Sequence, residues 1–250
     1  MSWSTMRTPP ATITGSIIMK ADVGIMAAAD TAAGIIKEMN VERTMKKTVI
    51  CFGDSNTFGY IPDGSGRFSS QERWPGRLQE LLGDEYLAAE EGVCGRTIIF
   101  REKGNPGICG LDCVEDALNR NQPADMLIVM LGTNDCKTEY HASAHQIARG
   151  VERIVERAKA CASAPARILL IAPAWLGVSV ETSVWRCDFD GESRRKSMAL
   201  ASAYKAVAEH QGCLFLDASR VIRASETDQV HLDREAHAAL AEAAAELVRG

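Results

Sequence analysis

The chain of 250 residues lacks the long segments that membrane proteins and nucleic-acid-binding proteins require. It has no run of about 18 apolar residues, so no membrane span is predicted. It has no long basic run, and its net charge of −5 argues against nucleic acid as a partner. An apolar-leaning stretch near the start is interrupted by Lys20, Asp22 and Asp30, and this pattern is not that of a signal peptide.

The cysteines and histidines do not form a metal-binding pattern. Cys109 and Cys113 flank Gly-Leu-Asp, whereas a common zinc knuckle has two intervening residues. His141 and His145 have the spacing of a helical metal pair, but Ala142 stands where such a zinc site has glutamate. We therefore predict no metal and no cofactor. The irregular spacing of the eight cysteines predicts reduced thiols and a cytoplasmic protein.

Strand-like and helix-like segments alternate from residue 45 onward. Helical spacing is found from Ile147, over Glu192–His210, and after Asp233, which is a suitable N-cap. Such alternation is typical of βαβ units, and it predicts a three-layer α/β/α domain with about five parallel strands. The expected strands are Thr48–Phe52, Tyr86–Glu91, Met126–Leu131, Arg167–Ile171 and Cys213–Leu216.

This domain is expected over residues 45–250, preceded by an extension of unknown role over residues 1–44. Met45 and two lysines come directly before the first expected strand. Three explanations of the extension stay open: a disordered segment, a helix around Ala28–Met39, or a start site placed upstream of the domain.

Four loops that follow expected strands carry polar residues with possible chemical roles. Ser55 lies in Gly-Asp-Ser-Asn-Thr after the first strand, and residues 92–97 follow the second. Residues 132–135 follow the third, and residues 228–231 follow the last. Since parallel strands end at the same edge of a sheet, we expect these distant segments to meet there.

Ser55, Asp228 and His231 have the side chains that nucleophilic catalysis needs. A serine hydroxyl requires a base to take its proton, and histidine exchanges protons near neutral pH. Asp228 lies three residues before His231, where a turn can direct its carboxylate to the imidazole and stabilise the imidazolium. Residue 57 is Thr, so Ser55 lacks the Gly-x-Ser-x-Gly motif, which argues against the α/β-hydrolase fold.

In order, the four segments resemble the blocks of the SGNH hydrolase superfamily, also called the GDSL esterases. The resemblance covers about residues 47–249 and is greatest to bacterial arylesterases and acyltransferase-type members. It implies a flavodoxin-like SGNH hydrolase fold. It also implies an oxyanion hole formed by the backbone N–H groups of Ser55 and Gly95 and the side-chain amide of Asn134.

Two segments without clear periodicity, residues 60–74 and 174–190, follow strand ends and are expected to overhang Ser55. The candidate substrate-binding residues are Asn56, Tyr60 and Trp175. Asn56 stands where leucine often follows the serine in this superfamily, and it could make the pocket more polar. For Trp175, pocket lining and loop anchoring stay open. Trp74 and Trp185 are expected to anchor loops or to form a subunit contact.

The resemblance implies a cofactor-independent serine esterase that acts on small-molecule esters through an acyl-enzyme. Short acyl groups such as acetyl, on aryl or alkyl alcohols, are the expected substrates, and an alcohol in place of water would give acyl transfer. Two alternatives stay open: a carbohydrate acetyl esterase and a catalytically idle binding domain. The complete set of Ser55, Asn134, Asp228 and His231 argues against the idle domain. A homo-oligomer is compatible with the sequence.

Overall fold

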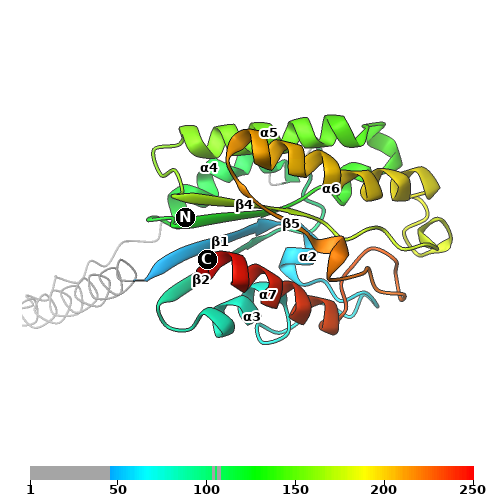
Figure 1. The fold of residues 1–250 in the computed structure, drawn as a ribbon. Coiled ribbons are helices and arrows are strands. Elements are labelled where there is room, and N and C mark those ends of the chain that lie inside the picture. Colours follow the sequence, from blue (N-terminus) through cyan, green and yellow to red (C-terminus); the bar gives the residue numbers. More distant parts are fainter. Residues whose placement is uncertain (1–45, 103–104, 106–107) are drawn as a thin grey trace, which may run out of the picture. The chain divides into compact units, whose positions relative to one another are not determined.

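The computed structural model describes residues 46–250 apart from 103–104 and 106–107. Its centre is a parallel sheet with the strand order β2-β1-β3-β4-β5 (Figure 1). The parallel sheet expected from the sequence is therefore confirmed. The strands are β1 (Lys47–Gly53), β2 (Tyr86–Gly92), β3 (Met126–Met130), β4 (Arg167–Ala172) and β5 (Leu214–Asp217).

Helices cover both faces of the sheet. In Figure 1, α4, α5 and α6 lie on one side of the strands, and α3 and α7 lie on the other. This is the three-layer α/β/α arrangement that the alternating pattern predicted. The helices are α2 (Ser55–Phe58), α3 (Trp74–Leu82), α4 (Gly110–Arg120), α5 (Ala144–Ala160), α6 (Gly191–Gln211) and α7 (Arg234–Arg249). Short 3₁₀ turns lie at Asn134–Cys136, Thr138–Tyr140, Val180–Thr182 and Ala218–Arg220.

Strand β1 illustrates how the core is built. Its side chains alternate between the two helical layers: Ile50 and Phe52 belong to one buried cluster, and Val49 and Cys51 belong to the other. Both clusters are apolar, so a central strand must be apolar on both faces. This is why β1 has a continuous apolar sequence rather than an alternating one.

The loops that carry the polar motifs leave the sheet at the same level. Gly53, the last residue of β1, pairs with Gly92 on one side and with Met130 on the other. A Cβ at Gly53 would lie 2.0 Å from the Thr57 Oγ1, and a Cβ at Gly92 would lie 2.3 Å from the backbone nitrogen of Phe58. Any side chain at these two strand ends would collide with α2, so glycine allows α2 to pack against the ends of β1 and β2.

Helix α7 begins where the sequence predicts. Asp233 is its N-cap, and its side chain accepts a hydrogen bond from the backbone N–H of Ala236 at 2.8 Å. Helix α6 ends at the expected Gly212, which has a left-handed conformation with φ of 62°. The cap at Asp233 fixes the end of the loop that carries His231.

Among the described residues, no helix combines the length and the apolar character that crossing a membrane demands. The proposed extension over residues 1–44 lies outside the described residues. Its boundary and its three explanations stay predictions.

The imidazole of His237 is buried between α3 and α7. Its Nδ1 accepts the backbone N–H of Trp74 at 3.3 Å, and its ring meets the Phe68 ring edge-on at a centroid distance of 5.2 Å. Burial, with smaller effects of His231 and Arg73, lowers the pKa of His237 from 6.5 to about 3. His237 therefore stays neutral in the folded protein.

We predict that His237 makes the fold sensitive to acid. Between about pH 6.5 and about pH 3 the unfolded chain binds a proton at His237 that the folded chain does not, so this contribution to stability is lost as the pH falls. In His237→Gln the amide oxygen can still accept the Trp74 N–H, but the titration is gone. Urea unfolding over this pH range should show wild type losing stability relative to the variant. A pH-independent difference would contradict the prediction.

Candidate active site

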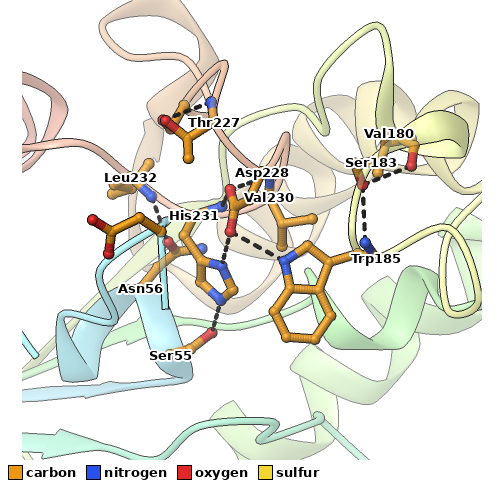
Figure 2. Close-up of polar contacts among 12 residues, drawn as sticks. Ser55, Asn56, Val180, Ser183, Trp185, Thr227, Asp228, Val230, His231 and Leu232 are labelled. Carbon is orange, nitrogen blue, oxygen red and sulfur yellow. Dashed lines mark hydrogen bonds and ion pairs between the residues drawn. The ribbon is translucent and has the colours of Figure 1, made fainter. Parts of the chain in front are cut away.

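The structure brings Ser55, His231 and Asp228 together at the carboxyl edge of the sheet (Figure 2). Ser55 is the first residue of α2, directly after β1, and the other two lie in the loop before α7. The His231 Nε2 is 2.9 Å from the Ser55 Oγ, and its Nδ1 is 2.5 Å from the Asp228 Oδ2. These contacts form the kind of hydrogen-bonded chain that a nucleophile, a base and an orienting carboxylate require.

The carboxylate of Asp228 is fully buried and accepts four hydrogen bonds. Its Oδ1 accepts the backbone N–H groups of Val230 at 3.0 Å and His231 at 2.9 Å. Its Oδ2 accepts the Nδ1 of His231 and the indole N–H of Trp185, which lies at 3.1 Å (Figure 2). Burial raises the pKa of Asp228, but the bonds and charge of His231 outweigh it and hold this pKa below its usual value. Asp228 is therefore an anion in a fixed orientation.

The turn between Asp228 and His231 depends on Gln229, which has a left-handed backbone with φ of 69°. This conformation is uncommon outside glycine and requires support. The backbone N–H of Gly177 donates to the Gln229 carbonyl at 2.8 Å, and the Ser179 N–H donates to its side-chain oxygen at 3.0 Å. The loop after β4 therefore holds the Asp–His turn in place.

Helix α2 is capped by Asp54, whose side chain accepts the Asn56 N–H at 2.9 Å. Burial raises the pKa of Asp54 to about 6, although the bond from Asn56 opposes this. The cap fixes the start of the helix, and with it the position of the Ser55 hydroxyl. Asp54 therefore has a local structural role at this turn.

The three expected oxyanion-hole donors lie around one small cavity. Ser55, Gly95 and Asn134 all line it, and Gly95 has a left-handed φ of 79°. Within the described residues, the backbone N–H groups of Ser55 and Gly95 have no hydrogen-bond acceptor. The Asn134 amide donates to the Arg96 carbonyl at 3.1 Å, which leaves its second N–H available. The arrangement can therefore offer three donors to a negative oxygen.

Two buried ionisable residues hold the loops that carry these donors. Both carboxylate oxygens of Asp135 accept the backbone N–H of Ile98 at 3.0 Å, and burial raises the pKa of Asp135 to about 7. Arg96 donates to the Gly53 carbonyl at 3.0 Å, and its guanidinium lies 4.3 Å from the Phe52 ring centroid. Asp135 therefore has a structural role. The role of Arg96, which depends on contacts across the sheet, was not expected.

The cavity at Ser55, which we call the inner pocket, has a volume of about 110 Å³. A neighbouring cavity of about 500 Å³, the outer cleft, shares Tyr60 and Trp185 with it. The rings of Tyr60 and Trp185 lie 4.5 Å and 5.5 Å from the His231 ring, measured between centroids. The inner pocket is lined by Ser55, Tyr60, Cys94, Gly95, Asn134, Lys137, Trp185, Phe189, Val230 and His231. The outer cleft is lined by Tyr60, Pro62, Asp63, Gly64, Val184, Trp185 and Thr227.

The candidate substrate-binding residues are distributed differently from the expectation. Tyr60 lines both cavities, as predicted. Trp175 lines neither cavity. It lies at the start of the loop after β4 and lines a separate cavity, where the Arg223 guanidinium is 5.8 Å from the centroid of its ring. Asn56 also lies outside both cavities: its side-chain oxygen accepts the Leu232 N–H at 3.0 Å (Figure 2). Asn56 thus joins the serine segment to the histidine segment.

Trp185 is the residue that the sequence interpretation placed wrongly. It was expected to anchor a loop or a subunit contact, yet it lines both cavities and contacts Asp228. The Ser183 hydroxyl accepts its backbone N–H at 3.1 Å and donates to the Val180 carbonyl at 2.8 Å (Figure 2). Trp74, by contrast, is fully buried in the core, as expected for an anchor.

Known proteins with similar sequences and structures agree with this site. Residues 51–239 match the GDSL-like lipase/acylhydrolase family. Est24, a carbohydrate acetylesterase from Sinorhizobium meliloti, is 33% identical with a TM-score of 0.76, and the match covers 82% of this chain and 99% of that one. The aryl esterase of M. smegmatis is 31% identical with a TM-score of 0.75, covering 81% and 98%.

Among curated proteins, an acetylxylan esterase of Xylanibacter ruminicola is 29% identical over 119 residues, which is 48% of this chain. The chain spans about a quarter of that relative's length, since the match covers 23% of it. The family match extends over more than half of the chain, so the chain belongs to the GDSL-like lipase/acylhydrolase family. The class predicted from the sequence, a carboxylic ester hydrolase of this family, is thereby confirmed.

Asn56→Leu should lower kcat about tenfold with little change in KM. The substitution leaves the buried Leu232 N–H without an acceptor, a loss of about 1–3 kcal/mol, and loosens the contact between the Ser55 and His231 segments. Steady-state kinetics on a p-nitrophenyl ester would measure it. A raised KM with unchanged kcat would instead support the substrate-binding role expected from the sequence.

Trp185→Phe should lower kcat/KM on a p-nitrophenyl ester about three- to tenfold. Phenylalanine keeps a ring between the two cavities but removes the N–H that bonds Asp228. The carboxylate then loses one of its four hydrogen bonds and orients the His231 imidazole less firmly. The matched control is Trp175→Phe, which lies outside both cavities and should leave kcat/KM unchanged. An unchanged kcat/KM in Trp185→Phe would refute this role.

Proposed function

We propose that this protein hydrolyses esters of short carboxylic acids through a covalent acyl-enzyme on Ser55. The observation that carries the proposal is the continuous hydrogen-bonded chain from Ser55 to His231 to Asp228, with distances of 2.9 Å and 2.5 Å. A serine whose hydroxyl already contacts a fixed, oriented base needs little rearrangement before it attacks. The complete chain also argues against a catalytically idle domain.

The first half of the reaction forms the acyl-enzyme. The Ser55 oxygen attacks the ester carbonyl while its proton passes to the His231 Nε2, and Asp228 stabilises the resulting imidazolium. We assign the N–H groups of Ser55, Gly95 and Asn134 to the negative oxygen of the tetrahedral intermediate. When the intermediate collapses, the C–O bond to the alcohol breaks and His231 donates the proton to the leaving oxygen. In the second half, water attacks the acyl carbonyl while its proton passes to His231. The bond to the Ser55 oxygen then breaks, His231 returns the proton to that oxygen, and the carboxylic acid leaves.

The size of the inner pocket supports a short acyl group. Its volume is about 110 Å³, against about 500 Å³ for the outer cleft. The pocket therefore suits acyl groups of a few heavy atoms, of which acetyl is the smallest common one. An octanoyl chain would have to leave the pocket or displace its walls.

The outer cleft supports an aryl or alkyl alcohol as the leaving group. Tyr60 and Trp185 give it two aromatic walls beside His231, the residue that protonates the leaving oxygen. A carbohydrate acetyl ester is the second candidate, favoured by the similarity to the carbohydrate acetylesterase Est24. Its sugar would occupy the same cleft, because aromatic walls with Asp63 and Thr227 offer both stacking surface and hydrogen-bonding groups.

Acyl transfer would follow if an alcohol in the outer cleft replaced water in the second half-reaction. The eight free cysteines are compatible with a reducing, cytoplasmic location. We propose a small-molecule ester and no nucleic acid as partner, and a homo-oligomer stays compatible with the chain.

Hydrolysis of p-nitrophenyl esters from acetyl to octanoyl should fall by at least about tenfold along the series, because the inner pocket excludes long chains. Ser55→Ala should reduce turnover of the acetyl ester by on the order of a thousandfold or more. A fluorophosphonate should label wild type and not Ser55→Ala. Turnover that survives in this variant would remove Ser55 as the nucleophile, and inactivity on all aryl esters with efficient labelling would favour acetylated carbohydrates.

A further inference from the structure

The inner pocket contains one cationic side chain that the catalytic steps above do not use. Lys137 lines this pocket together with Ser55 and Asn134, and its side chain is only 17% exposed. None of the residues lining the inner pocket is Asp or Glu. Lys137 thus gives a small and largely apolar pocket a positive charge.

The ammonium of Lys137 is weakly partnered. Its ion-pair partner within the described part of the chain is Glu139, at 4.0 Å, and the Glu139 side chain is 57% exposed. No hydrogen bond from its Nζ is found among the described residues. An ion pair at this distance with an exposed carboxylate contributes little. Lys137 therefore keeps hydrogen-bond donors for another anion.

Lys137 lies next to the expected oxyanion donor Asn134 and away from the outer cleft. Its backbone N–H donates to the carbonyl of Asn134 at 3.1 Å, which ties it to the expected oxyanion donor. The leaving alcohol must lie on the side of His231, because His231 protonates it, and the outer cleft opens there beside Tyr60 and Trp185. Lys137 does not line the outer cleft. The acyl group would thus extend toward Lys137.

We propose that Lys137 selects esters whose short acyl group ends in a carboxylate, such as half-esters of small dicarboxylic acids. This inference rests on the proposed esterase function and names the acyl class for the same site. A succinyl group has four carbons, so it is short enough for the pocket of about 110 Å³ while its carboxylate reaches past the reacting carbonyl. In a partly buried site, the attraction between a carboxylate and an ammonium is several times stronger than in bulk water.

The test compares two substrates with equal acyl length. Monoethyl succinate and ethyl butyrate both carry a four-carbon acyl group on ethanol, and only the first has a terminal carboxylate. A pH-stat follows both, with Ser55→Ala as the blank. Wild type should have the higher kcat/KM on the succinate. Lys137→Met should lower the succinate-to-butyrate ratio by at least about tenfold, and Lys137→Glu should lower it further. Lys137→Arg should keep most of the preference because it keeps the charge.

The matched control is Lys205→Met on α6, which makes the same change of net charge at a side chain that is 62% exposed. It should leave the hydrolysis rates of both the succinate and the butyrate ester unchanged. An unchanged succinate-to-butyrate ratio in this variant would show that the effect of Lys137→Met is local and does not come from the change in net charge. A second pair is 4-acetoxybenzoate and its methyl ester. Both have an acetyl group, and only the first has a carboxylate, which lies on the leaving phenol. The ratio for this pair should not respond to Lys137→Met.

Two results would overturn the inference while the esterase stands. One is normal hydrolysis of p-nitrophenyl acetate with the same succinate-to-butyrate ratio in wild type and Lys137→Met. The other is a Lys137→Met effect confined to the acetoxybenzoate pair, which would place Lys137 on the alcohol side. Loss of the proposed function is a different observation: wild type would hydrolyse none of these esters and would not be labelled by a fluorophosphonate.

Discussion

The buried carboxylate of Asp228 is the interaction on which the site depends. A fully buried anion is tolerated only where hydrogen bonds replace the lost water, and Asp228 accepts four of them. Two come from the backbone of its own turn, so the carboxylate shapes the loop that presents His231. The other two come from the His231 ring and from Trp185. One ion therefore fixes the loop, the orientation of the base and one wall of the pocket.

Other hydrogen bonds at the carboxyl edge of the sheet hold this loop next to Ser55. Asn56 connects the segment after β1 to Leu232, next to the base. Arg96 and Asp135 connect the second and third loops to each other and to β1. Buried polar groups are costly unless they are satisfied, and these hydrogen bonds join segments that lie far apart in the chain. They act together with apolar side chains of the same loops, since Ile98, Val230 and Leu232 belong to the buried core clusters.

Two cavities of different size and lining adjoin at this site. Tyr60 and Trp185 line both of them and also flank His231, so the same aromatic rings shape the two cavities and the surroundings of the imidazole. The charge of Lys137 distinguishes the inner pocket from the outer cleft, which contains Asp63 instead. The esters accepted therefore depend on loops, whereas the sheet determines only where those loops begin.

The sequence by itself determined the five strands, the start of α7 at Asp233, and the meeting of Ser55, His231 and Asp228 at one edge of the sheet. It could do so because apolar runs and caps are local signals and because parallel strands deliver their loops to one edge. The positions of Asn56, Trp175 and Trp185 were decided only by the tertiary structure. Trp175 and Trp185 lie in a loop without periodicity, and Asn56 lies in the short helix α2. Their roles depend on partners that lie far away in the chain: Leu232 for Asn56, Asp228 for Trp185 and Arg223 for Trp175. A buried indole N–H or amide oxygen needs a hydrogen-bond partner, but the neighbouring residues in the sequence do not indicate which partner it will have in the folded chain.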